Sequence, residues 1–358
     1  MTADAVGGVW RYCVDLAAEL VNGGAEVMIA TMGPRPGDEQ RREVSSLPQL
    51  RLIESDYALE WMPDAWEDVD AAGKWLFNFE SSFDPDVIHL NGYAHASLPW
   101  NKPVAVVAHS CVYSWWRGVH GCAPGPEWAE YKRRVTDGLS AAEVVVSPSA
   151  HMAGELEREY SVHKEKVLVI HNFTRTEFSP SARKQPFVLS AGRTWDGAKN
   201  LELLDRIAPK LDWEVRIAGD AVGPESSTRT GQHASFLGPL PHPELVKQMR
   251  AASIFAHPAL YEPFGLSVLE AARAGCCLVL SDIPSLRELW DGAAIFINPR
   301  EPERWIRELN RLSRNPRERE TLGDLAHSHS TKYPASLSVK QYREVYESLV
   351  SSNAGVAA

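Results

Sequence analysis

The sequence predicts two α/β domains, each built around a parallel β-sheet. Short apolar runs of β type alternate with amphipathic helical stretches along most of the chain, which is the pattern of parallel α/β proteins. The length of 358 residues favours two cores over a single large one. A polar, proline-containing stretch at 172–186 shows no sustained hydrophobic period, and we interpret it as the linker between the domains.

The first domain is predicted to cover residues 1–172. Its expected strands are 26–32, 86–90, 103–109, 143–149 and 166–170. Apolar residues at helical spacing predict helices over 10–21 and 150–160. A turn at Gly7 and Gly8 leads into the first helix, yet too few residues precede it for a full strand. The first strand is therefore either clipped or continued upstream, and we expect the second.

The second domain is predicted to cover residues 173–332. Its expected strands are 186–192, 213–219, 253–258, 276–282 and 293–297. Its expected helices are 199–210, 243–251, 265–274 and 302–315. A last helix around 337–350 could pack on either domain, and we assign it, as residues 333–350, to the first.

Composition indicates a soluble globular protein. The hydrophobic content is 44% and the charged content 23%, both ordinary values. Apolar runs fall short of the ~20 residues that span a bilayer, and the start lacks the basic and apolar regions of a signal peptide. Five cysteines form no CxxC pair, and Cys276 and Cys277 lie in an apolar run, as expected of small buried residues in a reducing compartment. We expect a cytoplasmic location.

The net charge of −10 is concentrated in the first half of the chain. Residues 1–172 hold 14 Lys/Arg and 25 Asp/Glu, whereas residues 173–358 hold 23 and 22. An acidic half argues against nucleic acid as a partner and against broad docking on anionic lipid. The basic residues at 132–134 could still contact an acceptor that is bound to lipid.

A first candidate site follows the strand expected at 186–192. Gly192 ends this strand, Arg193 comes next and Lys199 opens the following helix. In parallel sheets, ligands bind at the carboxyl ends of strands, where helix N-termini present free N–H groups. Arginine can grip two oxygens of a diphosphate, and lysine adds a point charge. The alternative is two solvated cations beside a loop, and these residues alone do not choose between the two.

A second candidate site is the stretch EPFGLSVLE, which places Glu262 and Glu270 around a strand-to-helix turn. The amides of Phe264, Gly265 and Leu266 would be unpaired donors at the helix start, where the helix dipole favours an anion. Glu262 could accept hydrogen bonds from hydroxyls, and a buried Glu270 would need a partner such as a ribose diol. The alternative makes these glutamates a capping accessory and a surface acid.

These motifs resemble those of the GT-B glycosyltransferases of family 4, which retain the configuration of the transferred sugar. EPFGLSVLE is similar to their E-x7-E signature, and AGRTWDGAKN to their diphosphate clamp. GGVWRYCVDLAAEL, VIHNFTRTEFSP and SDIPSLRELW resemble further family motifs in the same order, so the resemblance covers nearly the whole chain. It implies the GT-B fold, with two Rossmann-like, doubly wound parallel-sheet domains facing across a cleft.

The resemblance also implies roles for residues of the second domain. Glu262 would hold hydroxyls of the donor sugar, together with the amides of Phe264, Gly265 and Leu266. Glu270 would bind the ribose.

Further implied roles concern the phosphates and the reacting sugar. Arg193 and Lys199 would neutralise the diphosphate, and Gly8 would let the backbone of the first domain approach the donor phosphate. His109, at the end of the strand expected at 103–109, would lie near the reacting sugar. Without the resemblance, His109 is a lone histidine at a strand end, for which a structural role is the commoner one.

Aromatic residues suggest where an acceptor binds. Residues 1–172 contain eight of the twelve tryptophans. Trp115 and Trp116 lie in a stretch, 113–134, that we expect to be a long loop, and tryptophan faces can stack on the C–H faces of sugars. Tyr93 could line the same region. The alternative is a packed lid that binds no ligand.

Together these features predict an enzyme that moves a sugar from a nucleoside diphosphate sugar to a hydroxyl acceptor, a glycan or small glycoside, with retention. We expect no cofactor and no metal, because cationic side chains and a helix N-terminus can stabilise the leaving diphosphate and the sequence shows no suitable DxD turn.

Other interpretations stay open. They are a GT-B sugar phosphorylase or epimerase, a transferase homologue that binds nucleotide without turnover, and a two-domain sugar-binding protein. The sequence does not specify the base, the sugar, the acceptor or the oligomeric state.

Overall fold

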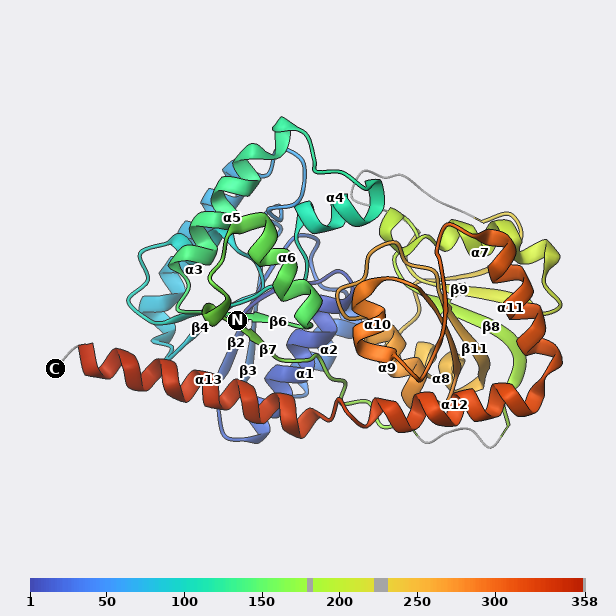
Figure 1. Cartoon of the computed structure of the whole chain (residues 1–358). Coiled ribbons are helices and arrows are strands. Elements are labelled where there is room, and N and C mark those ends of the chain that lie inside the picture. Colours follow the sequence, from blue (N-terminus) through green and yellow to red (C-terminus); the bar gives the residue numbers. More distant parts are fainter. Residues whose placement is uncertain (179–182, 222–230, 357–358) are drawn as a thin grey trace. The chain divides into compact units, whose positions relative to one another are not determined.

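The computed structural model describes residues 1–178, 183–221 and 231–356 (Figure 1). The chain divides into two compact units. The first unit consists of Met1–Phe173 and Ala335–Ala358, and the second of Thr174–Pro334. The prediction of two parallel α/β domains is confirmed, because every strand pair described is parallel.

The first unit contains two short parallel sheets. One has the order β1-β2-β3 and the other β4-β5-β6-β7. The strands are β1 (Thr2–Asp4), β2 (Val27–Met32), β3 (Leu50–Glu54), β4 (Ile88–Leu90), β5 (Val104–Val107), β6 (Val144–Ser147) and β7 (Val167–Val169). Asn91, just after β4, joins the sheets, since its amide N donates to Thr2 Oγ1 (2.9 Å) and its Nδ2 to the Thr2 carbonyl (2.7 Å). The resulting strand order resembles that of doubly wound folds.

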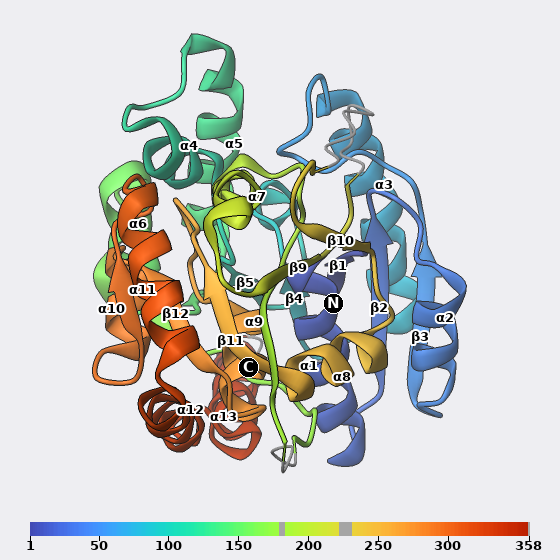
Figure 2. The same cartoon turned by 90° about the vertical axis from the view of Figure 1, so that its right-hand side faces the viewer.

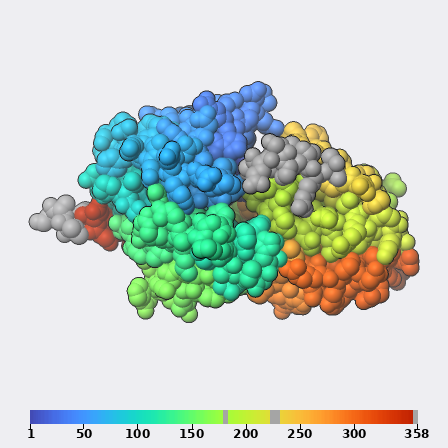
Figure 3. All heavy atoms as spheres, turned by 90° about the horizontal axis from the view of Figure 1, so that it is seen from above, coloured from blue at the N-terminus to red at the C-terminus, as the bar shows by residue number. Residues whose placement is uncertain are grey.

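Helices connect these strands. They are α1 (Gly8–Asn22), α2 (Asp38–Ser45), α3 (Trp66–Phe83), α4 (Val112–His120), α5 (Ala129–Ala141), α6 (Ala150–Tyr160) and the C-terminal α13 (Ala335–Val356). Helix α13 belongs to the first unit, where Tyr342 and Tyr346 hydrogen-bond to Tyr12 and His89 (2.6 and 2.7 Å). Its last turns extend beyond the rest of that unit (Figure 3).

The prediction of a long loop at 113–134 is wrong. Helix α4 begins this stretch, a 3₁₀ turn covers 126–128 and α5 follows. Cys111 starts α4 because its Sγ accepts from the Ser114 amide, which satisfies one unpaired donor of the first turn. Sequence patterning also missed β3, α2 and α3.

The second unit is built on one six-stranded sheet with the order β10-β9-β8-β11-β12-β13 (Figure 2). The strands are β8 (Gln185–Ala191), β9 (Glu214–Ala218), β10 (Ser235–Gly238), β11 (Ala252–His257), β12 (Cys277–Ser281) and β13 (Ile295–Ile297). This is the Rossmann order, and it reverses between β8 and β11. Ligands bind beyond the carboxyl ends of the strands at such a switch point.

Helices cover both faces of this sheet. They are α7 (Leu201–Ile207), α8 (His242–Ala251), α9 (Leu266–Arg273), α10 (Pro284–Trp290), α11 (Pro302–Arg314) and α12 (Pro316–Ser330). The helix predicted at 199–210 is shorter, because 3₁₀ turns at 197–199 and 208–210 replace its ends and Pro209 lacks the N–H that a longer helix needs.

Strand residues alternate between two cores in this unit. On β12, Leu278 and Leu280 face a core that includes residues of α8, α9, α10 and α12, whereas Cys277 and Val279 face a core formed with α7 and α11. This two-sided burial explains why the strands are almost continuously apolar. Cys276 and Cys277 are fully buried free thiols, as predicted.

Candidate functional site

Two loops meet at the switch point of the second unit. One follows β8 and carries Arg193, and the other follows β11 and carries Glu262. The loops are joined by backbone and side-chain hydrogen bonds. The Leu260 amide donates to the Ala198 carbonyl (2.7 Å), and Asn200 Nδ2 donates to the Pro258 carbonyl (2.9 Å). The first loop is thereby held against the turn that precedes α9.

Glu262 lies at the centre of this junction. Its Oε2 accepts from Lys199 Nζ (2.6 Å) and from His257 Nε2 (2.9 Å). Ser285 Oγ donates to its carbonyl oxygen (2.5 Å). Among the residues that the structure describes, the side-chain contacts of Glu262 all use Oε2, so Oε1 is the oxygen available to a ligand.

The charge state of Glu262 follows from the same contacts. Burial by itself would raise the pKa of this carboxyl, which is 8% exposed. The positive charge of Lys199 and the hydrogen bond from His257 outweigh burial and hold the pKa of Glu262 well below its usual range. Glu262 is therefore a stable carboxylate and a weak proton acceptor.

His257, the last residue of β11, was not identified from the sequence. Its side chain is fully buried and stacks near Phe255, while its Nε2–H donates to Glu262. Its Nδ1 has no partner among the described residues. Burying an unpaired nitrogen costs free energy, and the same imidazole orients Glu262. A histidine at the end of a buried strand, five positions before Glu262, was the available signal.

Arg193 is held from two sides. Its guanidinium pairs with Asp196 (Nη2–Oδ2, 2.9 Å) and lies 5.1 Å from the centre of the Trp195 ring. Asp196 in turn accepts from the Ala198 amide (3.0 Å). These contacts fix the Arg193 side chain, which is partly exposed, at the edge of the sheet.

The turn into α9 has the geometry expected of an anion site. Gly265 has a φ of +84°, which only glycine adopts without strain. Because Gly265 and Leu266 begin the helix, their amides cannot take part in its internal hydrogen-bond ladder. Phe264 packs in the core against Tyr333, with ring centres 5.7 Å apart, and anchors the turn.

Glu270, on the second turn of α9, is 4% exposed. Its Oε1 accepts from His242 Nε2 at 2.8 Å and from Thr174 Oγ1 at 3.5 Å. The buried carboxylate thus has a partner within the chain, and His242 is a residue that sequence reasoning missed.

In the first unit, His109 follows β5 and forms a chain of hydrogen bonds. Its Nε2–H donates to Asn91 Oδ1 (2.7 Å), and Asn91 Nδ2 donates to the Thr2 carbonyl. The ring also packs edge-on against Tyr12, 4.5 Å between centres. Removal from water lowers the pKa of His109 to about 3, so the imidazole is neutral near pH 7 and its Nδ1 is a hydrogen-bond acceptor.

The remaining predicted residues of the first unit lie in different settings. Gly8 is the first residue of α1, directly after Gly7 with its φ of +80°. Trp115 and Trp116 are on α4, partly exposed, with ring centres 5.9 Å apart. Tyr93 is instead buried in the core, where its hydroxyl donates to the Ser110 carbonyl (2.8 Å). With 3% of its surface exposed, Tyr93 offers little area for contact with a ligand.

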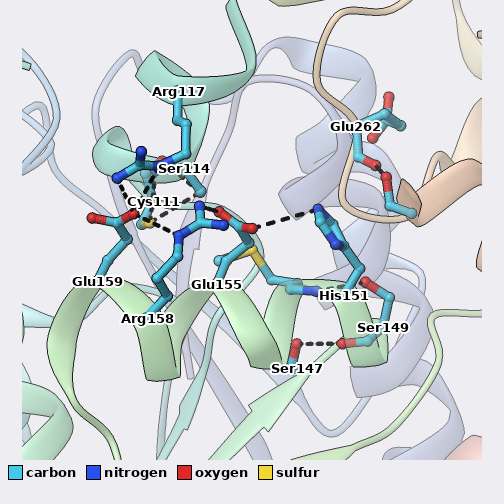
Figure 4. Close-up of polar contacts among 12 residues, drawn as sticks. Cys111, Ser114, Arg117, Ser147, Ser149, His151, Glu155, Arg158, Glu159 and Glu262 are labelled. Carbon is cyan, nitrogen blue, oxygen red and sulfur yellow. Dashed lines mark hydrogen bonds and ion pairs between the residues drawn. The ribbon is translucent and has the colours of Figure 1, made fainter. Parts of the chain in front are cut away.

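A polar cluster fastens α4 to α6 (Figure 4). Arg117 on α4 donates to the buried Glu159 on α6 from Nη2 (2.7 Å) and Nε (3.0 Å), and Arg158 also pairs with Glu159 (3.0 Å). The pairing lowers the pKa of Glu159 although burial opposes it. The cluster fixes the helix that carries Trp115 and Trp116.

Two family models together match the chain from residue 6 to residue 329. The model described as Glycosyltransferase Family 4 matches residues 6–178, and the one described as Glycosyl transferases group 1 matches residues 173–329. The chain belongs to the family 4, group 1 glycosyltransferases. The resemblance drawn from its motifs is confirmed.

Named relatives of this glycosyltransferase include the D-inositol 3-phosphate glycosyltransferase of Corynebacterium diphtheriae, 24% identical over 95% of this chain and 89% of the relative. The glycogen synthase of Mycobacterium tuberculosis is 24% identical over 79% of this chain and 76% of its own length. Sequence similarity to both extends over most of the glycosyltransferase.

Solved structures show that the glycosyltransferase has the GT-B fold. Sucrose-phosphate synthase from Thermosynechococcus elongatus superposes with a TM-score of 0.79 at 20% identity, covering 97% of this chain and 94% of that one. Anabaena Alr3699/HepE, solved in complex with UDP and glucose, gives 0.73 at 17% identity, covering 96% of each chain.

The glycosyltransferase thus collects complementary groups in its second unit. Lys199 and Glu262 are in direct contact, and Arg193 lies in the same loop as Lys199. The α9 N-terminus and Glu270 follow along the chain. Such a set can bind an anion together with hydroxyl groups. Within the described residues there is no group of three or more His, Cys, Asp or Glu side chains that could hold a metal ion, and no helix is long and apolar enough to cross a bilayer.

Proposed function

We propose that this glycosyltransferase moves a sugar from a nucleoside diphosphate sugar to a hydroxyl acceptor with retention of anomeric configuration. Arg193, Lys199 and the α9 N-terminus would bind the diphosphate, Glu262 Oε1 hydroxyls of the donor sugar and Glu270 the ribose. The observation that carries this proposal is the Lys199–Glu262 contact of 2.6 Å. It joins a cation suited to phosphate and an acceptor suited to sugar hydroxyls at one sheet edge.

In the proposed reaction, the bond between the anomeric carbon and the diphosphate oxygen breaks and a glycosidic C–O bond forms. The acceptor hydroxyl gives its proton to the departing diphosphate. Cations and helix amides stabilise the charge that develops on the leaving group. The low pKa of Glu262 makes this carboxylate a poor base, which fits a reaction in which the departing diphosphate takes the acceptor proton.

The first unit would contribute acceptor and sugar contacts. The neutral His109 could accept a hydrogen bond from a donor-sugar hydroxyl at Nδ1, and the backbone at Gly8 could approach the donor phosphate. Trp115 and Trp116 would stack on a carbohydrate acceptor. Relatives named for D-inositol 3-phosphate and a neighbour solved with UDP and glucose support a nucleotide-sugar donor and a hydroxylated acceptor. We expect no metal requirement, so turnover should persist in chelator.

A thermal-shift panel tests the donor. UDP, GDP, ADP, TDP and their sugar conjugates are added to wild type, to Arg193→Ala and to Arg314→Ala, a control whose side chain is exposed and paired with Asp212. Ligand at 100 Kd should stabilise by about 2.7 kcal/mol. We expect one nucleotide family to raise the Tm of wild type and of the control, but not of Arg193→Ala. No shift of wild type with any nucleotide contradicts the proposal.

Product analysis separates the alternatives. NMR of the product from an α-linked donor should show an α linkage if configuration is retained. A reaction that depends on free phosphate would identify a phosphorylase, and binding without turnover a homologue that lacks activity.

A further inference from the structure

The carboxylate of Glu270 is already engaged through a single oxygen. Both contacts formed by described residues, from His242 Nε2 (2.8 Å) and from Thr174 Oγ1 (3.5 Å), reach Oε1. The His242 contact is the shorter by 0.7 Å, and the Thr174 contact is at the long limit for a hydrogen bond.

A ribose diol can use both oxygens of this carboxylate. Two adjacent hydroxyls can donate two hydrogen bonds, and a carboxylate can receive one on each oxygen. Oε2 could take one hydroxyl without change. The second hydroxyl would meet Oε1 where His242 already donates.

The backbone of His242 is restricted, whereas its side chain is partly exposed. It is the first residue of α8 and stands between Pro241 and Pro243, whose rings restrict the backbone. Helix α8 packs on α9 (Figure 2). The His242 side chain is 28% exposed, whereas that of Glu270 is 5% exposed, so the imidazole lies nearer to solvent than the carboxylate that it contacts.

We propose that His242 is an internal competitor for the ribose in the nucleotide site. In the free protein it satisfies Glu270, and a ribose diol must displace it from Oε1 to bind fully. His242 thus weakens the binding of ribonucleotides and favours their release after transfer. This inference rests on the proposed function, in which Glu270 binds the ribose.

Competition by His242 predicts tighter nucleotide binding when the residue is removed, whereas removal of an ordinary binding residue weakens binding. His242→Ala should tighten the binding of a ribonucleoside diphosphate, because Oε1 then keeps only the longer contact from Thr174. A 2′-deoxy nucleotide has lost one hydroxyl and can bind through Oε2 alone, so its affinity should change little.

The experiment is calorimetric titration of UDP, GDP and ADP and of their 2′-deoxy counterparts. The variants are His242→Ala, His242→Gln, which keeps an amide donor, and His163→Ala, an exposed histidine of the first unit as control. For the base that binds, we expect a three- to tenfold lower Kd of the ribonucleotide in His242→Ala and less than a twofold change for the 2′-deoxy form. His242→Gln and His163→Ala should resemble wild type.

Two outcomes overturn this inference. Weaker ribonucleotide binding in His242→Ala would show that His242 assists the ligand, and equal changes for both sugars would show that it does not contact the 2′-hydroxyl position. If wild type binds none of the nucleotides, the proposed function fails and this inference fails with it. That outcome is distinct from one in which nucleotides bind but the Kd values of wild type and His242→Ala are the same.

Discussion

Replacing Lys199 by methionine tests the ion pair at the centre of the site. The pair is short, 2.6 Å, and its side chains are only 17% and 10% exposed. Methionine keeps most of the apolar stem but removes the charge, so Glu262 stays buried with His257 as its remaining side-chain partner. Removing one member of a buried pair costs about 3–5 kcal/mol. We expect about 3 kcal/mol, the lower end, because His257 still donates.

A double-mutant cycle isolates the interaction. Glu262→Gln keeps the shape without the charge, and Lys199→Met with Glu262→Gln should recover much of the stability lost in Lys199→Met. We expect a coupling of about 2 kcal/mol or more in urea unfolding followed by tryptophan fluorescence. Lys210→Met is the control, since Lys210 pairs with Glu303 on the exposed surface, where such pairs contribute about 0–1 kcal/mol.

The pH dependence gives a second signature. The folded pKa of Glu262 lies well below the ordinary glutamate value of 4.5. Its stabilising contribution is therefore present above pH 4.5 and is lost as the pH falls toward the folded value. In Lys199→Met the carboxyl can protonate more readily, so the cost of the substitution should shrink as the pH falls below 4.5. A cost no larger than that of Lys210→Met at pH 7 would refute the buried ion pair.

Two further predictions concern other parts of the chain. His109 should remain neutral between pH 8 and pH 5, because its pKa is lowered to about 3 by removal from water; an NMR titration step near pH 6.5 would contradict this. Gly219→Ala should destabilise by about 3 kcal/mol or more, because a Cβ would lie 1.8 Å from the Gly192 carbonyl oxygen at a φ of +153°. Gly197→Ala, where a Cβ meets nothing within 4 Å, is the control in the same thermal melts, and equal Tm values would refute the clash.

The sequence by itself predicted the buried strands of both units. Strands β8, β11 and β12 were placed within one or two residues, because a strand covered on both faces is a continuous apolar run that is visible locally. Strand β3 was missed because its side chains beyond Leu50 are exposed or only partly buried, so the strand is not a continuous apolar run. The stretch around Trp115 was predicted as a loop because the contacts that hold α4, such as Arg117 with Glu159, come from a distant helix.

The candidate site was predicted in its residue types but not in its pairings. Arg193, Lys199, Glu262 and Glu270 stand in recognisable motifs, and a motif is local in sequence. The partners of these residues depend on which strands are neighbours: Lys199 reaches Glu262 across 63 positions, because β8 and β11 lie side by side in the sheet.

His242 likewise reaches Glu270 across 28 positions, because α8 packs on α9. Hydrophobic periodicity reports whether a residue is buried, since burial repeats with the local backbone geometry. It does not report which residue lies opposite, since that depends on the order of strands and the packing of helices. The residue types of the candidate site were therefore predictable from the sequence, whereas the contacts of Glu262 with Lys199 and of Glu270 with His242 were decided only by the tertiary structure.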